Sequence, residues 1–256
     1  MASAVKNEPR VLYLYGITEE EPHKIPELIG VDRFSGVESI DCDGICCWVS
    51  QVPATEFVEN LARNMENLEW LAETSVAHQR VIAAIAKKTE ILPARLGTIF
   101  RSQASLCRHV KRRAAGLKSD FARVRGADEW GVKVFEIEPV IAELPKPETG
   151  REYLQAKAAL MPKRRIKPPA NGEIAKFERA LEAIAEEIAP AGTVSRGQRG
   201  LSFQTTLLIK RSRRKQLEAL LEKFARDWAS DRRIECTGPW PPYSFVSRPD
   251  DGVGSK

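Results

Sequence analysis

The sequence predicts an α+β protein with two domains, and three observations support this fold class. The second half changes repeatedly between the two-residue hydrophobic period of strands and the 3.6-residue period of helices. The first half opens with an apolar, strand-like segment and contains the hairpin-turn signal Asp43-Gly44. Residues 237–246 hold three prolines within four positions, which excludes a helix or a central strand there. A chain of 256 residues is long enough for two hydrophobic cores.

The first elements follow from local signals. Residues 11–15 are nearly all apolar and rich in strand formers, which predicts a central strand covered on both faces. Two prolines within residues 22–30 leave room for a turn of helix at most. The Asp43-Gly44 signal between residues 37–42 and 45–49 predicts a hairpin of two further strands, which Pro53 ends. From residue 54 to 85 apolar residues recur at helical spacing, with a break between two helices at residues 64–67.

A basic helix is predicted to follow. Pro93 and Gly97 indicate a strand and a loop within residues 89–100. Ser102 is placed to cap a long helix with an apolar stripe from Leu106 to Val124. The other face of this helix is basic and is the best local candidate for contact with an anionic partner. Its candidate interaction residues are Arg108, Lys111 and Arg112.

The second half predicts a ferredoxin-like domain. Residues 130–137 read as a strand, 149–160 and 173–189 as helices, and 193–196 and 201–209 as strands. Ser212 is expected to cap a further helix, and residues 232–237 form a last strand. This βαββαβ order, with an extra helix and a basic insert at residues 162–169, is that of the ferredoxin-like fold. The first half is a distorted α+β relative. The expected domains are residues 1–127, residues 128–237, and a strap and tail at residues 238–256.

Composition indicates an ordinary globular protein. A net charge of +5 and a pI near 9.0 suit an acidic partner, although 40 basic against 35 acidic residues is a small imbalance. Five cysteines without a CxxC motif indicate a reduced, cytoplasmic protein and no metal site. No apolar stretch approaches the length of a membrane span, and the N-terminus has no signal-peptide pattern, so no contact with a membrane is expected.

An enzyme is the less favoured class. The sequence contains no GxGxxG, P-loop, GxSxG or HExxH motif, so no catalytic residue and no cofactor is assigned. If the chain were a cofactor-dependent oxidoreductase, His78, Arg95 and Glu129 would be the polar residues to test first. His78 lies near the apolar stripe of its helix, and only Thr74 and Ser75 offer polar side chains at helical spacing, which favours a structural histidine.

An RNA-binding module is the other alternative, because the ferredoxin-like fold also serves RNA recognition. Residues 199–206 match the opening of the RNP1 pattern and supply Phe203. Leu201 and Thr206 stand where the other two aromatic residues are needed. A single stacking ring is weak support for single-strand binding, so no nucleic-acid partner is expected.

The proline-rich stretch is Thr237-Gly238-Pro239-Trp240-Pro241-Pro242-Tyr243-Ser244-Phe245-Val246. We expect it to run as a polyproline II rod, in which Trp240 and Tyr243 lie on the same side. Burial of these rings would contribute several kcal/mol at about 25 cal/mol per Å², so the rod is expected to dock as a strap on its own chain. Pro239 and Pro242 also form a PxxP pattern, which leaves a ligand role open.

This decapeptide resembles the C-terminal signature of the GvpF/GvpL family of gas vesicle proteins. Further stretches resemble the same family: residues 13–17 (YLYGI), His78, residues 91–100 (ILPARLGTIF), 129–134 (EWGVKV) and 150–154 (GREYL). Two positions depart from the family pattern, because Leu96 replaces a usual aromatic residue and Gln79 a usual glutamate.

The resemblance implies an accessory protein of gas vesicles, located on the vesicle in the cytoplasm. It implies contact with the hydrophobic shell protein and other vesicle proteins, and it implies no catalysis, nucleotide or metal. The residues expected to form the interaction surface are Trp240, Tyr243, Phe245, Arg108, Lys111 and Arg112.

Overall fold

The computed structural model describes residues 8–22, 25–137, 171–189 and 198–247. The chain divides into two compact units, Met1–Trp130 with Gly238–Lys256 and Gly131–Thr237. Both boundaries lie inside strands, β6 (Ala127–Glu136) and β9 (Arg232–Trp240). The residues that follow β9 therefore belong with the first unit.

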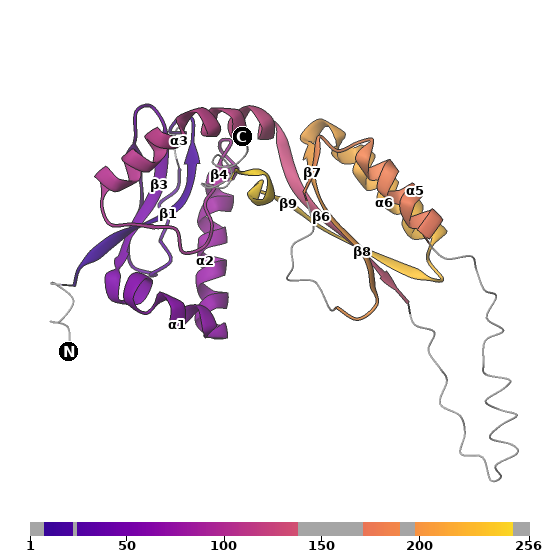
Figure 1. Ribbon diagram of the computed structural model, residues 1–256, viewed down its shortest axis with the longest axis horizontal. Coiled ribbons are helices and arrows are strands. Elements are labelled where there is room, and N and C mark those ends of the chain that lie inside the picture. The colour runs from indigo at the N-terminus through magenta and orange to yellow at the C-terminus, as the bar shows by residue number, and fades with distance from the viewer. Residues whose placement is uncertain (1–7, 23–24, 138–170, 190–197, 248–256) are drawn as a thin grey trace, which may run out of the picture. The chain divides into compact units, whose positions relative to one another are not determined.

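The first unit contains an antiparallel sheet (Figure 1). Its strands are β1 (Arg10–Thr18), β2 (Val37–Asp41), β3 (Cys46–Pro53), β4 (Leu92–Pro93) and β5 (Ile99–Phe100). Their order is β2-β3-β1-β4, and β5 also pairs with β1. Asp43 and Gly44 have φ angles of 58° and 80°, as the central residues of a type I′ turn require. The predicted hairpin is confirmed.

Between β3 and β6, the described part of this unit has four helical segments. They are a π-helical turn (Thr55–Glu59), α1 (Leu61–Glu66), α2 (Leu68–Ala86) and α3 (Gln103–Val124). The break before α2 lies at Asn67, whose side chain accepts hydrogen bonds from the backbone N–H groups of Glu69 and Trp70. Ser102 caps α3 in a reciprocal capping box with Ser105. Both helix starts were readable from the sequence.

The sheet packs on both faces, as the apolar sequence of β1 predicted. Tyr13 and Tyr15 point to a core that also contains Val81 and Ile85 of α2. Leu14 points to the other face, where it lines a cavity with Leu117 of α3. The pairing of β1 with β3 shifts register between Leu14 and Gly16. Such an irregularity changes the face of the sheet to which the side chains after it point.

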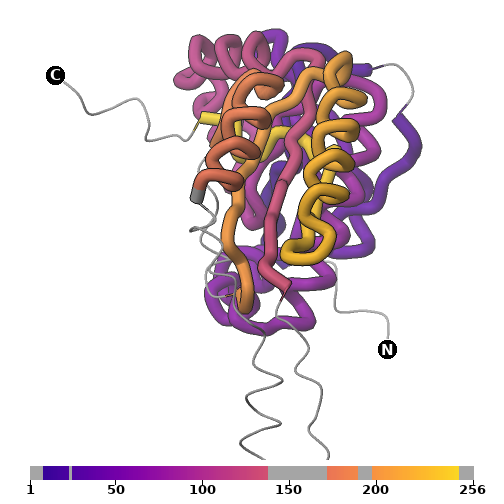
Figure 2. Tube along the Cα trace, turned by 90° about the vertical axis from the view of Figure 1, so that its right-hand side faces the viewer, coloured from indigo at the N-terminus to yellow at the C-terminus, as the bar shows by residue number. Residues whose placement is uncertain are grey.

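Within the residues that the structure describes, the second unit has a four-stranded sheet and two helices. Its described elements besides β6 and β9 are α5 (Asn171–Glu182), β7 (Glu187–Ala189), β8 (Leu201–Lys210), a 3₁₀ turn (Arg211–Arg213) and α6 (Arg214–Asp227). The strand order β7-β8-β6-β9 corresponds to the second, third, first and fourth strands of a βαββαβ unit, and the first sheet repeats this order. Figures 1 and 2 show α5 and α6 side by side on one face of the sheet.

Aromatic rings form the core between these helices. Phe177 of α5 meets Phe224 and Trp228 at centroid distances of 4.8 and 5.2 Å, both edge to face. Phe177 and Leu217 are fully buried. Such pairs add about 0.5 to 1.5 kcal/mol to the burial of apolar area, so the helical stripes identified in the sequence are the buried faces.

Two expected element ends are corrected. The helix expected over residues 173–189 ends at Glu182, and residues 187–189 form β7, which pairs with β8 from Glu187 opposite Leu208 to Ala189 opposite Thr206. A strand of three residues is too short to show a two-residue hydrophobic period, so the apolar residues of β7 resemble a continuation of the helical pattern. Ser212 does not cap α6, because a 3₁₀ turn precedes that helix and its N-cap, Arg213, makes no side-chain capping bond. The helix expected at 149–160, the insert at 162–169 and the strand at 193–196 lie outside the described residues.

The expectation of five reduced cysteines is wrong. Cys42, in the hairpin turn, and Cys107, in α3, form a disulfide with a Cα–Cα distance of 4.9 Å. The two residues are 65 positions apart in the sequence, so only the packing of α3 beside the hairpin brings their sulfurs together. Cys46 and Cys47 are buried free thiols and Cys236 is an exposed one.

Within the described residues, no helix has the length and apolarity needed to cross a membrane.

Candidate functional site

The C-terminal strap, defined here as residues 238–247, returns to the first unit after β9. It is not the continuous polyproline II rod that was expected. β9 continues to Trp240, and Tyr243–Phe245 form a single 3₁₀ turn in which the N–H of Phe245 donates to the carbonyl of Pro242. Proline is tolerated at the end of a strand, where its missing N–H is not needed for pairing. The prolines therefore did not show that β9 extends to Trp240.

A buried carboxylate of α3 holds the end of the strap. Asp120 is 1% exposed and accepts hydrogen bonds from the backbone N–H (3.0 Å) and the hydroxyl (2.7 Å) of Ser247. Arg123 donates to the same carboxylate and to the carbonyl of Phe245, and Arg113 donates to the carbonyl of Ser247. Charge-assisted hydrogen bonds are stronger than those between neutral groups. Charged side chains of α3 therefore hold the main chain of the strap.

Two further side chains of the first unit bind the strap. Glu129 accepts from the backbone N–H (2.7 Å) and the hydroxyl (2.9 Å) of Ser244. Burial raises the pKa of Glu129, and the two hydrogen bonds from Ser244 oppose this shift. The hydroxyl of Tyr243 donates to Oε1 of Gln79 at 2.6 Å. The strap is therefore tied to α2, α3 and β6.

The three aromatic residues of the expected interaction surface have different settings. Phe245 is 2% exposed and is part of the protein interior, so it has no surface to offer a partner. Tyr243 is half-buried, and burial raises the pKa of its hydroxyl above the ordinary value. Trp240 is 44% exposed. Of the three rings, that of Trp240 is the most available for contact with another protein.

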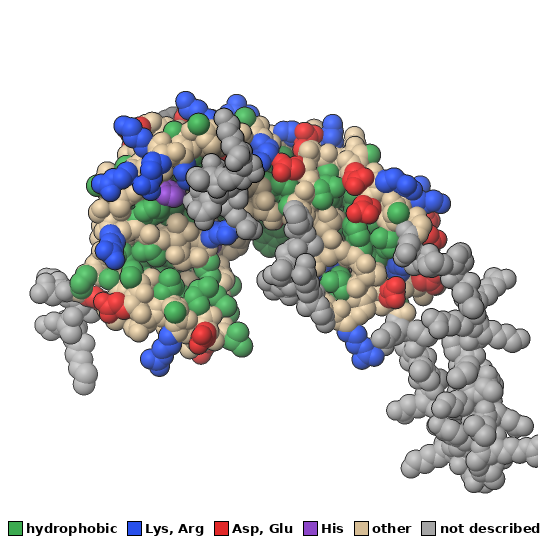
Figure 3. Space-filling view, in the orientation of Figure 1, with side chains coloured by type: hydrophobic (Ala, Val, Ile, Leu, Met, Phe, Trp, Pro, Cys, Tyr) green, Lys and Arg blue, Asp and Glu red, His purple; other side chains and the backbone are tan. Residues whose placement is uncertain are grey.

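The basic face of α3 lies at the surface, as its sequence suggested. Arg108, Lys111 and Arg112 are exposed, and Figure 3 shows blue side chains gathered over α3. Lys111 lies 3.7 Å from Asp43 of the hairpin turn, with both side chains more than three-quarters exposed. Exposed pairs of this kind contribute little to stability, so the basic face keeps most of its positive potential.

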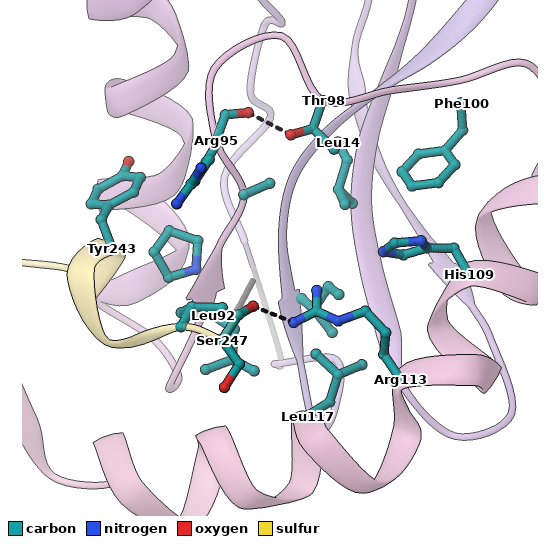
Figure 4. Close-up of a pocket in the computed structure, with 14 residues that line it drawn as sticks. Leu14, Leu92, Arg95, Thr98, Phe100, His109, Arg113, Leu117, Tyr243 and Ser247 are labelled. Carbon is teal, nitrogen blue, oxygen red and sulfur yellow. Dashed lines mark hydrogen bonds between the residues drawn. The ribbon is translucent and has the colours of Figure 1, made fainter. Parts of the chain in front are cut away.

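An apolar cavity of about 160 Å³ lies between the sheet, α3 and the strap (Figure 4). Leu14, Leu92 and Leu117 line it and are at most 4% exposed. Figure 4 shows His109 and Arg113 reaching toward it from α3, with Arg95 on the side of Tyr243. Burial and the neighbouring Arg113 and Arg112 lower the pKa of His109, so its imidazole is neutral near pH 7. The sequence predicted neither this cavity nor the strap's anchor at Asp120.

Asp120 had one recognisable signal. It is the only acidic residue of α3, a helix whose surface is otherwise basic, and it precedes Phe121 of the apolar stripe. A lone carboxylate at the edge of an apolar stripe must find donors when it is buried. The sequence does not show that two of the donors belong to Ser247, more than a hundred residues away.

The polar residues considered for catalysis, His78, Arg95 and Glu129, all lie in the first unit. His78 is 4% exposed, and its ring nitrogens meet the hydroxyl of Tyr13 (3.0 Å) and the carbonyl of Ala94 (3.1 Å). Burial lowers its pKa to about 4. Its burial and its two hydrogen bonds are those expected of a structural histidine. Glu129 holds the strap, and Arg95 lines the cavity.

Phe203, the single ring of the RNP1-like stretch, packs against Phe177 of α5 at a centroid distance of 5.8 Å. Bases stack on the sheet face that helices leave open. Because this ring contacts a helix, it is not presented as a stacking platform.

Comparison with known proteins agrees with the sequence signature. Residues 11–247 match the family described as "Gas vesicle synthesis protein GvpL/GvpF". Gas vesicle protein L of a Streptomyces species is 30% identical over 263 residues, which cover 95% of this chain and 96% of the relative. Gas vesicle protein F1 of Halobacterium salinarum is 23% identical and covers 92% of both chains.

Solved structures show the same fold. The crystal structure of GvpF from Anabaena matches with a TM-score of 0.68 and 18% identity, covering 93% of this chain and 97% of that one. GvpF from Microcystis aeruginosa matches with a TM-score of 0.67 and 19% identity, covering 93% and 99%. From its family match and its relatives, this chain belongs to the GvpL/GvpF family of gas vesicle synthesis proteins.

Proposed function

We propose that this protein binds the hydrophobic shell protein of gas vesicles, and other vesicle proteins, while the gas-filled shell forms. Membership of the GvpL/GvpF family supports a role in gas vesicle synthesis. The observation that carries the binding role is the strap, which presents Trp240 at 44% exposure beside a turn anchored by Glu129 and Asp120. A ring on an anchored support loses little conformational freedom on binding.

The physical need for such a partner comes from the shell subunit. A small subunit with an apolar face aggregates in water until it joins the growing shell. A folded protein that covers this face, with an aromatic anchor or by adding a strand to an open sheet edge, would keep the subunit available. In the described part of the second sheet, β7 and β9 are the outer strands in the order and are the candidate edges.

The basic face of α3 supplies a second kind of contact. Arg108, Lys111 and Arg112 are exposed on one helix and would attract acidic segments of other vesicle proteins. Charges at the rim of an interface mainly raise the association rate and make it sensitive to salt. We assign the protein no catalytic step and no cofactor, and we place it at the gas vesicle in the cytoplasm.

A co-purification experiment tests the proposal. The tagged chain would be co-expressed with the gas vesicle shell protein of its own organism, and the amount of shell protein retained would be measured for the unmodified chain, Trp240→Ala and Phe34→Ala. Phe34 is a matched control because it is an aromatic side chain 87% exposed in a turn of the first unit. We expect Trp240→Ala to reduce the retained shell protein at least about tenfold, since truncating an interface anchor costs about 2 kcal/mol or more.

The opposite results are equally clear. Shell protein that is not retained by the unmodified chain would overturn the proposal. If Trp240→Ala retains as much shell protein as the unmodified chain and Phe34→Ala retains less, the interface does not include the strap.

A further inference from the structure

The cavity beside the strap has the size of one large side chain. Its volume of about 160 Å³ is close to the roughly 150 Å³ of an engineered apolar cavity that binds benzene. The sheet, α3 and the strap all contribute to its walls. The sheet supplies Leu14 of β1 and Leu92 of β4, α3 supplies Leu117, and the strap supplies Val246. An apolar cavity of this kind gains free energy from a bulky aliphatic or aromatic group and little from water.

The polar groups around the cavity are basic or neutral. Arg95, His109 and Arg113 line it, and the lining residues that the structure describes include no aspartate or glutamate. Arg113 is occupied with the carbonyl of Ser247. Arg95 is exposed, and its guanidinium makes no hydrogen bond or ion pair with any residue that the structure describes. The cavity therefore combines an apolar interior with an available cation at its side.

The outer surface of α3 extends this positive potential. Arg108 and Arg112 are exposed one residue before His109 and Arg113, which line the cavity. A ligand that places an apolar group in the cavity while it carries a negative charge meets attraction from Arg95 on one side and from α3 on the other. A basic group at the same place would be repelled.

From these observations we propose that the cavity is a receptor for an acidic segment of a partner protein, with one leucine-sized side chain inserted and an adjacent carboxylate paired with Arg95. The apolar group gives affinity, and the charged hydrogen bond to the guanidinium fixes the orientation of the segment. The strap forms one wall of the receptor, so its anchoring at Asp120 also sets the shape of the site. This inference rests on the proposed function only in taking the partner to be a vesicle protein.

The test uses synthetic peptides and the full chain. The probe is the blocked pentapeptide acetyl-Gly-Glu-Leu-Glu-Gly-amide, and the readout is the methyl NMR spectrum of the chain labelled at leucine and valine. We expect saturable shifts of the methyl groups of Leu14, Leu92, Leu117 and Val246. Replacing the peptide's leucine by alanine should weaken binding at least about tenfold, because roughly 0.8 kcal/mol is lost per CH₂ group. Replacing both glutamates by glutamine should also weaken binding about tenfold.

Two variants of the protein locate the site. Val246→Phe adds volume to the wall of the cavity and should abolish the methyl shifts without lowering the melting temperature, since the new atoms enter empty space. Arg95→Ala, an exposed substitution that leaves the core intact, should weaken binding about tenfold. Arg63→Ala removes an exposed arginine from α1 and is the matched control, which should bind like the unmodified chain.

Three results would overturn the inference. They are shifts confined to methyl groups outside the cavity, equal affinity for the glutamate and glutamine peptides, and an Arg95→Ala chain that binds as tightly as Arg63→Ala. The peptides contain no vesicle protein, so failure here is separate from failure of the shell-protein experiment. If the peptide binds and the Arg95→Ala and Val246→Phe chains still retain the shell protein, the cavity is assigned to a different vesicle protein.

Discussion

Asp120 and Ser247 are 127 residues apart in the sequence, yet the buried carboxylate of one accepts both the backbone N–H and the hydroxyl of the other. This contact joins the C-terminal strap to the helix that precedes the second unit. It also orders Val246, which forms a wall of the cavity. The stability of the first unit and the shape of its candidate site therefore depend on the same carboxylate.

Replacement of Asp120 should release the strap. Asp120→Ala removes the buried carboxylate that Arg113, Arg123 and Ser247 bind; because both arginine side chains are partly exposed, the cost should lie at the lower end of the range for a broken buried pair, about 3 kcal/mol. Ser247→Ala removes a single hydroxyl contact and should cost about 1 kcal/mol. Urea unfolding measures both values, and limited proteolysis should cut the strap of Asp120→Ala first. Equal destabilisation by the two substitutions would show that the carboxylate is not the anchor.

The buried His78 makes stability depend on pH. Its pKa is lowered to about 4 from an ordinary value of 6.5, so the unfolded chain binds its proton more tightly than the folded chain. The stabilisation by neutral His78 is fully present above pH 6.5 and is lost as the pH falls toward 4. At 1.36 kcal/mol per pH unit, the loss amounts to about 3 kcal/mol. Urea unfolding of the unmodified chain and of His78→Gln at pH 7 and pH 4.5 measures this difference, and a variant with an unchanged pH slope would contradict it.

Reduction of the Cys42–Cys107 disulfide should lower stability. The bond closes a loop over a sequence separation of 65, and the chain-entropy relation gives about 4 kcal/mol for a loop of this length. Urea unfolding with and without dithiothreitol measures the effect. Cys42→Ser should behave like the reduced chain, whereas Cys236→Ser replaces an exposed free cysteine and should leave the midpoint unchanged. A midpoint insensitive to reduction would contradict the prediction.

Gly16 allows β4 to approach β1 closely. A Cβ atom at this position would lie 2.7 Å from Cδ1 of Ile91 and 2.9 Å from the carbonyl oxygen of Leu92. Gly16→Ala must therefore displace a buried side chain and backbone, and overpacking of this kind costs about 1 to 3 kcal/mol. Gly36→Ala is the matched control, because no atom lies within 4 Å of its added Cβ. Thermal unfolding should separate the two variants, and similar melting temperatures would argue against the close approach.

The elements that the sequence predicted well have local causes. Asp43-Gly44 can adopt the positive φ angles of a hairpin turn without help from the rest of the chain, and Ser102 caps α3 through a residue three positions away. The apolar stripes of α2 and α5 were readable for the same reason, since one helical face must be buried. The strand β7 was missed because its three residues acquire strand structure only by pairing with β8.

The amino-acid sequence alone determined the α+β class, the family signature at residues 237–246 and the burial of His78. Only the tertiary structure decided that Phe245 is buried, that Cys42 meets Cys107, and that Asp120 anchors Ser247 beside an apolar cavity. The physical reason is the range of the interactions. Turns, caps and amphipathic faces depend on neighbours within a few residues, whereas each of these contacts joins segments 65 or more residues apart.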